Sequence, residues 1–258
     1  FMIRILVTND DGVQSEGIDV LVDALGSLGD VYVVAPEAEA SASGHALTLR
    51  RPLRIKEISK NRYGVDGTPT DCVNVAVSQI LKTVPDLVVS GINKGWNLGD
   101  DITYSGTVAG ALEGVLLGAP ALAVSQQRVR GPFDFQQAAG VAKHLAELVL
   151  ENGLPSRTFL NVNVPHQPAR GVKVTSQAKR NHRTSVAEAY DPRRQAYYWI
   201  DQAQLQWKTD GRSDYEMVQD GWISITPLQS DWTAYGSIEK VKSLVGSLSS
   251  ETTSLLNR

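Results

Sequence analysis

The sequence predicts an α/β fold built on a doubly wound, mostly parallel sheet. Short apolar runs alternate along the chain with longer amphipathic stretches, and the first four runs are almost continuously apolar. A continuous apolar run predicts a strand that is buried on both faces, as in a parallel sheet covered by helices. Strands that alternate with helices are typical of a doubly wound sheet.

Five apolar runs provide the expected strands of this sheet. They lie at residues 5–7, 31–35, 86–90, 121–125 and 159–164. The expected helices lie between or beside them, at residues 17–28, 69–82, 106–117 and 135–151. The second helix has a marked start, because Thr68 can cap it, Pro69 suits its first position and Asp71 follows three residues after the cap.

The pattern changes in the last third of the chain. We therefore expect a catalytic core over residues 1–165 and a C-terminal portion over 166–258 that is not an independent domain. Residues 172–200 are polar with aromatic interruptions, which predicts an extended arm or hairpin. Residues 222–227 predict a late strand, and residues 236–250 predict a weakly amphipathic terminal helix.

Composition excludes several classes of protein. The chain has 258 residues, of which 42% are hydrophobic, so it has ample material for one large core. A net charge of -3 does not indicate a nucleic acid polymer as partner. The densest basic stretch, residues 179–183, is typical of a solvated loop, with binding of an anionic ligand as the alternative.

The same composition predicts where the protein works. No apolar run approaches the ~20 residues that span a bilayer, so we expect no membrane partner. The sequence contains a single cysteine, Cys72, and we expect no signal peptide, because the pattern of the first strand starts near residue 3. A reducing, cytoplasmic setting is therefore expected.

Polar side chains follow the first expected strand, where ligands bind in an open α/β sheet. This strand runs directly into Asn9, Asp10 and Asp11. Two adjacent carboxylates at the end of a buried strand repel each other, so a bound cation would hold them ionised. Oxygen ligands favour Mg²⁺ or Mn²⁺ over zinc. An ordinary tight turn is an equally good interpretation of these residues taken alone.

The second and third expected strands also end in polar loops. Residues 37–45 form a loop of small residues, which alone is more typical of a flexible surface segment. His45 is a candidate general acid or phosphate ligand, although a lone histidine is more often structural. After the third strand, Asn93 offers a neutral oxygen to a metal, Asn97 is a candidate donor to phosphate, and Lys94 is a candidate charge partner.

A helix is expected to begin immediately after Ser105, at Gly106 and Thr107. Hydroxyls and free backbone N–H groups at a helix N-terminus form an anion site, with plain N-capping by Ser105 as the alternative. A divalent metal beside such a site suits hydrolysis of a phosphate ester. The metal would lower the pKa of the attacking water, and the helix end would stabilise the phosphoryl oxygens.

Five blocks of the sequence together resemble one known family. The blocks are residues 5–12, 34–36, 67–73, 90–93 and 104–108. In this combination and order the chain resembles the SurE family of survival proteins, whose members are metal-dependent nucleoside 5′/3′-monophosphate phosphatases. The resemblance covers roughly residues 2–125 and continues more loosely to about residue 230.

The resemblance implies a set of site residues. One divalent metal, Mg²⁺ or Mn²⁺, would be bound in each subunit by Asp10, Asp11, Ser41 and Asn93. The choice of Ser41 over Ser43 comes from the resemblance alone. The implied phosphate pocket consists of Asn97, Ser105, Gly106 and Thr107, and Asn9 would shape the turn or contact phosphate.

The resemblance also implies an architecture and an assembly. The family fold is a Rossmann-like core followed by a C-terminal portion that makes contacts in dimers or tetramers. The arm at residues 172–200 would then reach a neighbouring subunit of a homo-oligomer. Trp96 stands where small residues or proline are common in the family, which affects the expected loop shape. The block at 67–71 is better interpreted as a capped helix start than as a substrate contact.

The predicted function is hydrolysis of nucleoside monophosphates to nucleoside and phosphate, with short polyphosphate as a further candidate substrate. One alternative is a phosphatase that forms an aspartyl-phosphate on Asp10, which Gly12 at the expected second acid position weakens. Another is a non-catalytic nucleotide- or phosphate-sensing module, which the two carboxylates disfavour. A dinucleotide oxidoreductase is disfavoured because no Gly-x-Gly-x-x-Gly turn follows the first strand.

Overall fold

The computed structural model describes residues 2–131, 133–181, 185–201, 206–208 and 210–246. The chain divides into two compact units, Phe1–Leu228 and Gln229–Arg258. Part of the basic stretch, at residues 182–183, lies outside the described residues, as does the end of the expected terminal helix beyond residue 246.

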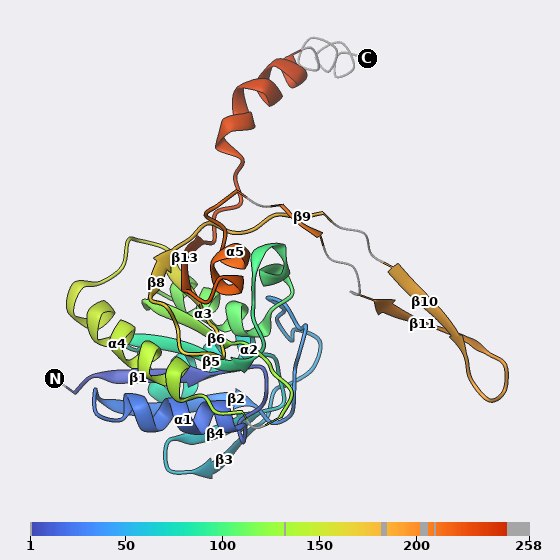
Figure 1. The fold of residues 1–258 in the computed structure, drawn as a ribbon. Helices are drawn as coiled ribbons and strands as arrows, with labels where there is room; N and C mark the ends of the chain where they lie inside the picture. Colours follow the sequence, from blue (N-terminus) through green and yellow to red (C-terminus); the bar gives the residue numbers. More distant parts are fainter. Residues whose placement is uncertain (1, 132, 182–184, 202–205, 209, 247–258) are drawn as a thin grey trace, which may run out of the picture. The chain divides into compact units, whose positions relative to one another are not determined.

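One large sheet organises the first unit. Its strands are β1 (Arg4–Thr8), β2 (Asp30–Pro36), β3 (Ile55–Ser59), β4 (Arg62–Val65), β5 (Leu87–Lys94), β6 (Ala121–Gln126), β7 (Thr158–Val164), β8 (Val172–Val174) and β13 (Ile223–Gln229). Across the sheet the order of these described strands is β3-β4-β2-β1-β5-β6-β7-β13-β8 (Figure 1). Adjacent strands from β4 to β7 pair in parallel, as do β13 and β8, whereas β3 is antiparallel to β4. The predicted α/β fold with a mostly parallel sheet is confirmed.

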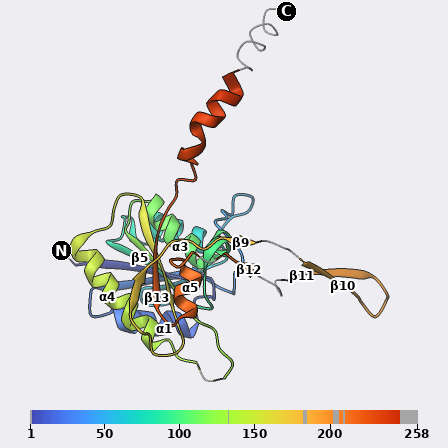
Figure 2. The same ribbon diagram turned by 45° about the horizontal axis from the view of Figure 1, so that its top comes forward.

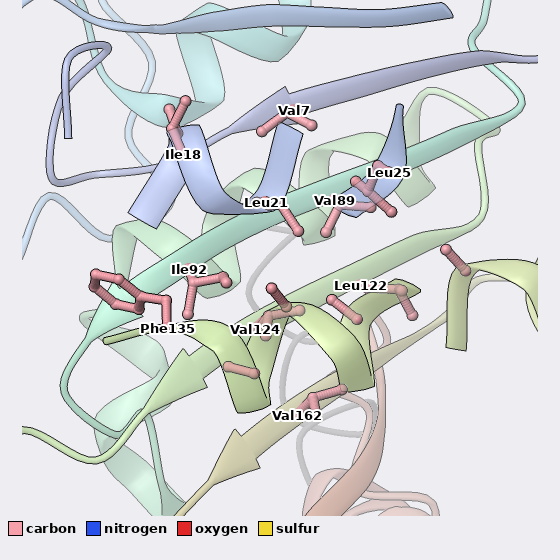
Figure 3. Packing of buried hydrophobic residues seen from close by; sticks show 14 of the residues in the cluster. Val7, Ile18, Leu21, Leu25, Val89, Ile92, Leu122, Val124, Phe135 and Val162 are labelled. Atoms are coloured by element: carbon pink, nitrogen blue, oxygen red, sulfur yellow. The ribbon is translucent and has the colours of Figure 1, made fainter. Parts of the chain in front are cut away.

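Helices cover both faces of this sheet (Figures 1 and 2). On one face lie α1 (Glu16–Leu25) and α4 (Gln136–Asn152), and on the other lie α2 (Pro69–Val75) and α3 (Gly106–Leu116). Figure 3 shows the first face, where Ile18, Leu21 and Leu25 of α1 pack with Val7 and Val89 of the sheet. Burial on both faces explains why the central strands are continuously apolar.

The strand order reverses between β1 and β5. From β1 the chain continues to β2 on one side, and later enters β5 on the other side of β1. Thr8 and Ser90 are partners in the register of β1 and β5, so the loops after these strands open at the same edge. Such a topological switch point is where open α/β sheets bind ligands.

The expected helix over residues 69–82 is divided in the structure. The α-helical part ends at Val75, and a π-helical segment, Ala76–Leu81, ends at Lys82 with a positive φ of 55°. Its start is a capping box, as predicted: the backbone N–H of Asp71 donates to the Thr68 hydroxyl, and the backbone N–H of Thr68 donates to the Asp71 carboxylate. The block around Thr68 therefore has a structural role.

Several short elements escaped sequence-based prediction, among them β3, β4 and α5 (Asp214–Gln219), and β8 belongs to the large sheet although its residues were expected to begin the C-terminal arm. The strands β3 and β8 lie at the two edges of the sheet, and their side chains are mostly exposed. Exposed edge strands carry no continuous apolar run, so their pattern resembles a polar loop. The helix α5 spans only six residues and is marked by its Ser213 N-cap.

A separate two-stranded hairpin pairs β10 (Ser185–Tyr190) with β11 (Ala196–Asp201), and β9 (Arg180–Asn181) pairs with β12 (Gln206–Trp207). In the second unit, a 3₁₀ turn at Tyr235–Ser237 leads into a helix over residues 238–246. None of the helices in the described part of the chain has both the length and the apolar character that crossing a membrane requires.

Candidate metal and phosphate site

The two aspartates of the predicted metal pair lie directly after β1, at the switch point of the sheet. Asp10 is buried, with 5% of its surface exposed, and Asp11 is half-buried. Burial raises the pKa of Asp10, against the opposing effect of the Thr107 hydroxyl. Burial, followed by the charge of Asp10, raises the pKa of Asp11. A cation between them would stabilise both carboxylates in their ionised form.

Asn9 shapes the turn that presents these aspartates. Its side-chain nitrogen donates to the Gly12 carbonyl at 3.1 Å and to the Ser15 hydroxyl at 2.7 Å. Its side-chain oxygen accepts from the Gly12 backbone N–H at 3.2 Å. Of the two roles considered for Asn9, these bonds favour turn formation over contact with phosphate.

The start of α3 packs directly against Asp10. The Thr107 hydroxyl donates to Asp10 Oδ1 at 2.6 Å, and the Ser105 hydroxyl caps the helix by accepting from the Val108 backbone N–H at 3.1 Å. A Cβ at Gly106 would lie 2.7 Å from Asp10 Cβ, so only glycine allows this approach. The metal pair and the predicted phosphate helix therefore meet in space.

Two backbone hydrogen bonds hold the loop after β2 at this site. The Ala40 N–H donates to the Asp10 carbonyl at 2.8 Å, and the Gly44 N–H donates to the Tyr104 carbonyl at 3.0 Å. Ser41, the predicted metal ligand, is exposed, and its hydroxyl donates to Glu39 Oε1 at 2.7 Å. A serine that sequence reasoning passed over, Ser43, is also in this loop.

Asn93 and Lys94 bring the end of β5 to the same place. The Asn93 side-chain nitrogen donates to the Gly95 carbonyl at 3.0 Å, which leaves its side-chain oxygen as the amide atom suited to a metal. The Lys94 backbone N–H donates to Asp11 Oδ2 at 3.3 Å. The Lys94 ammonium lies 4.9 Å from the ring centre of Phe133, so the side chain is held by a cation–π contact.

Asn97 is fixed by polar side chains from two neighbouring strands. Its side-chain nitrogen donates to the Ser125 hydroxyl at 2.7 Å, and its backbone N–H donates to Asn163 Oδ1 at 2.8 Å. Its carbonyl accepts from the side chains of Asn161 and Asn163, each at 2.9 Å. The Trp96 ring nitrogen donates to the Val164 carbonyl at 2.9 Å and anchors the same segment.

Sequence reasoning missed the roles of Asn161, Asn163 and Ser125. All three are buried in β6 or β7 and hold the loop that contains Asn97. One signal was present, because asparagines at alternate positions within an apolar strand are unusual and require buried partners.

Glu113 is a second missed residue. It is buried on α3, where its carboxylate meets the His45 ring nitrogen at 2.6 Å and accepts from the Asn74 side chain at 2.6 Å. This contact gives His45 a structural role, since it ties the loop after β2 to α3. No local pattern pointed to Glu113, because its partners are 68 and 39 residues away.

The residues present fit a hard divalent metal. In the part of the chain that the structure describes, no three His, Cys, Asp or Glu side chains gather to hold an ion. A metal at the Asp10–Asp11 pair would therefore need neutral oxygen ligands as well, and Asn93 and the serines of the loop can supply them. A buried and a half-buried carboxylate, each with a raised pKa, are the feature of the site that calls for a cation.

Together the fold and the site define a class of protein: a doubly wound α/β protein with a carboxylate pair at the switch point, of which Asp10 contacts a helix N-terminus. This combination suits enzymes that use a metal ion on a phosphate group. The chain belongs to the SurE family, because the family model described as "Survival protein SurE" matches residues 5–184. The resemblance predicted from the five sequence blocks is thereby confirmed.

Relatives of similar length support this assignment. The chain is 50% identical over 242 residues to a protein of Geotalea uraniireducens (strain Rf4) named 5′-nucleotidase SurE, covering 93% of this chain and 98% of that protein. It is 51% identical over 236 residues to the protein of the same name from Syntrophotalea carbinolica, covering 91% and 94%. The crystal structure of the SurE protein from Aquifex aeolicus superposes with a TM-score of 0.82 at 42% identity, covering 93% of this chain and 99% of that chain.

Proposed function

We propose that this protein is a metal-dependent 5′-nucleotidase that hydrolyses nucleoside monophosphates to nucleoside and phosphate. The observation that carries the proposal is the contact between Asp10 and the first turn of α3, where Thr107 donates to the carboxylate. A metal bound by Asp10 would lie beside the helix N-terminus that attracts phosphate. The names of the relatives support the same activity.

Each residue has a defined task in this proposal. Asp10, Asp11, Asn93 and Ser41 would hold one Mg²⁺ or Mn²⁺ ion per subunit. When bound, the ion supplies Lewis-acid activation of water and offsets the charge of the phosphate. The backbone N–H groups of the first turn of α3, beginning at Gly106, would bind the equatorial phosphoryl oxygens.

Other polar groups near the site have supporting tasks. In our proposal Asn97, held by its bonds to β6 and β7, contacts the phosphate, and Ser105 and Thr107 set the position of the helix start. The backbone N–H of Lys94 bonds to Asp11, which puts Lys94 at the site. Its ammonium lies on a flexible stem and would therefore reach a bound phosphate. Charge on the phosphate would favour this contact over the cation–π contact with Phe133.

A phosphate-release screen tests the proposed activity directly. Nucleoside 5′- and 3′-monophosphates and short polyphosphate would be incubated with the protein and a panel of divalent metals. We expect release from nucleoside monophosphates with Mg²⁺ or Mn²⁺ and none after exhaustive chelation. Turnover that persists in chelated protein, or binding of mononucleotides without turnover across all metals, would contradict the proposal.

Solvent labelling separates the two hydrolytic mechanisms. In a single turnover in ¹⁸O-labelled water, attack by water places the label directly in the phosphate. If an aspartyl-phosphate forms on Asp10 and water attacks its carboxyl carbon, the label enters the Asp10 carboxylate. If water attacks its phosphorus, the label enters phosphate only in this second step, and trapping of the acyl phosphate reveals the intermediate. We expect label in phosphate and no trapped intermediate.

We also propose that the β10–β11 hairpin forms contacts between subunits of a dimer or tetramer. Its Tyr198, Trp199 and Ile200 side chains are 63%, 67% and 76% exposed, and exposed apolar groups of this size favour a protein contact. Light scattering of a Trp199→Ser variant tests this, with a lower molar mass than the wild type as the expected result. A cytoplasmic location remains our expectation from the single cysteine.

A further inference from the structure

We propose that Ser43 is a phosphate-binding residue, whose hydroxyl donates to a phosphate oxygen at the N-terminus of α3. The inference rests on the proposed function and adds a residue to its phosphate pocket. The Ser43 Oγ is buried and has no hydrogen-bond partner in the described part of the chain. A buried hydroxyl without a partner loses its hydrogen bonds to water and gains none in return.

The loop holds Ser43 over the first turn of α3. One backbone hydrogen bond lies on each side of it in sequence, from Ala40 to the Asp10 carbonyl and from Gly44 to the Tyr104 carbonyl. A Cβ at Gly106 would lie 2.9 Å from Ser43 Oγ and 2.9 Å from Asp10 Oδ2. The Ser43 hydroxyl and Asp10 Oδ2 therefore both lie against the start of α3 at Gly106, where no larger residue would fit.

The chemistry of the groups around Gly106 suits the edge of a phosphate bound to a metal. Asp10 Oδ1 accepts from the Thr107 hydroxyl, and the backbone N–H groups of Gly106 and Thr107 also lower the pKa of the Asp10 carboxylate, against the raising effect of burial; in our proposal this carboxylate binds the metal ion. The Ser43 hydroxyl is a donor, as are the backbone N–H groups at the helix start, and phosphate oxygens are acceptors. A phosphate oxygen at the helix start would give Ser43 the partner that it lacks.

Ser41 differs from Ser43 in its exposure and in its hydrogen bonding. It is exposed, and its hydroxyl already donates to Glu39. The two serines would thus have separate tasks, with Ser41 on the metal side and Ser43 on the phosphate side of the pocket.

Ser90 provides a matched control. Its hydroxyl is also buried without a partner among the described residues, but it lies against Gly110, one turn further along α3. Ser90→Ala makes the same chemical change as Ser43→Ala, at a position away from the helix start.

The test is calorimetric titration of inorganic phosphate into wild-type protein and both variants, each saturated with Mn²⁺. We expect Ser43→Ala to weaken phosphate binding about tenfold, the effect of one hydrogen bond to a charged group, while Ser90→Ala stays within about twofold of wild type. Without ligand, the melting temperature of Ser43→Ala should equal or exceed that of the wild type, because an unpaired hydroxyl is removed.

Three results would overturn the inference. These are phosphate binding by Ser43→Ala within about twofold of wild type, equal weakening in both variants, or a melting temperature of Ser43→Ala clearly below that of Ser90→Ala. Absence of phosphate binding by metal-saturated wild type would overturn it as well. If the wild type binds phosphate but hydrolyses no nucleoside monophosphate, the proposed function fails while the phosphate titration still decides the role of Ser43.

Discussion

The Thr107 hydroxyl donates a 2.6 Å hydrogen bond to Oδ1 of Asp10, across 97 residues of sequence. This bond joins the end of β1 to the first turn of α3. It fixes the rotation of the Asp10 carboxylate, with Oδ1 bonded to the Thr107 hydroxyl and Oδ2 close to Gly106. In the proposed site, this one contact would set the positions of both the metal ion and the phosphate.

Thr107→Val should weaken metal binding. The substitution keeps the side-chain shape but removes a hydrogen bond to a charged group, worth about 1.5–3 kcal/mol, or roughly tenfold or more in affinity. Calorimetric titration of Mn²⁺ measures the change. Thr83→Val, at an exposed position with only a 3.5 Å contact, serves as control. Equal Mn²⁺ affinity in wild type and Thr107→Val would show that the bond does not position the carboxylate.

Asp10→Asn should stabilise the metal-free protein and abolish the stabilisation that a bound metal ion provides. Burial raises the pKa of Asp10, which means that the folded protein disfavours the charged form present at neutral pH. The neutral amide removes this penalty but also removes a metal ligand. Loss of a residue that hydrogen-bonds to a metal ligand typically lowers activity roughly 10–100-fold. Loss of the ligand Asp10 itself should lower phosphate release by more than this.

Thermal unfolding with Mn²⁺ and with chelator measures the stability part of this prediction. We expect the melting temperature of the wild type to rise with Mn²⁺ and that of Asp10→Asn to stay constant. A full Mn²⁺-induced rise in the variant would mean that Asp10 does not hold the metal.

Gly106→Ala should inactivate the protein without unfolding it. The new Cβ would lie 2.7 Å from Asp10 Cβ and 2.9 Å from both Asp10 Oδ2 and Ser43 Oγ, so the loop or the carboxylate must move. A displacement of this kind in a catalytic site costs activity on the order of 10²-fold. Gly140→Ala in α4 is the matched control, because nothing lies within 4 Å of its Cβ.

Phosphate-release assays and urea unfolding distinguish the two glycine variants. Gly140→Ala should keep its activity and gain about 0.5–1 kcal/mol of stability, the usual preference of a helix interior for alanine. Activity of Gly106→Ala near the wild-type level would contradict the close packing of α3 on Asp10.

Asp214 should make stability depend on pH. It is fully buried, and its carboxylate accepts the backbone N–H groups of Gly99, Ala178 and Tyr215. Burial raises the pKa of Asp214 above its ordinary value of 3.8, despite these hydrogen bonds. Above pH 3.8 the native state therefore keeps a proton that the unfolded state has lost, and the Asp214 contribution to stability falls as pH rises through the raised pKa.

Urea unfolding of wild type and Asp214→Asn between about pH 4 and pH 7 tests this sign, because other titrating groups cancel in the difference. The unfolding free energy of the wild type minus that of the variant should decrease as pH rises. A difference that increases with pH would mean that the hydrogen bonds outweigh burial and lower the pKa of Asp214.

The core of the fold could be predicted because its signal is local. The strands β1, β2, β5, β6 and β7 and the helices α1, α3 and α4 lie close to the predicted ranges. Each has an apolar pattern of its own, since burial on both faces demands a continuous run and burial on one face demands helical spacing. The edge strands β3 and β8 lack such a run, and their pairing depends on a neighbour far along the chain.

The same division applies to the site. Asp10, Asp11, Asn93 and the start of α3 could be proposed from sequence alone, because carboxyl ends of parallel strands meet at one edge of a sheet. The individual roles of the nearby polar groups could not be proposed from sequence alone. The partners of Glu113, the use of Asn9 in its turn and the unpaired hydroxyl of Ser43 became visible only in three dimensions.

By itself, the sequence therefore determined the class of fold and the family, which depend on short windows of residues and on the order of strands, and it predicted the metal pair. The tertiary structure alone decided which hydroxyl lies beside Gly106 and which oxygen of Asp10 accepts from Thr107. The physical reason is that hydrogen bonds and close packing act over a few ångströms in space. Residues 97 positions apart come within that range only when the sheet and helices are packed.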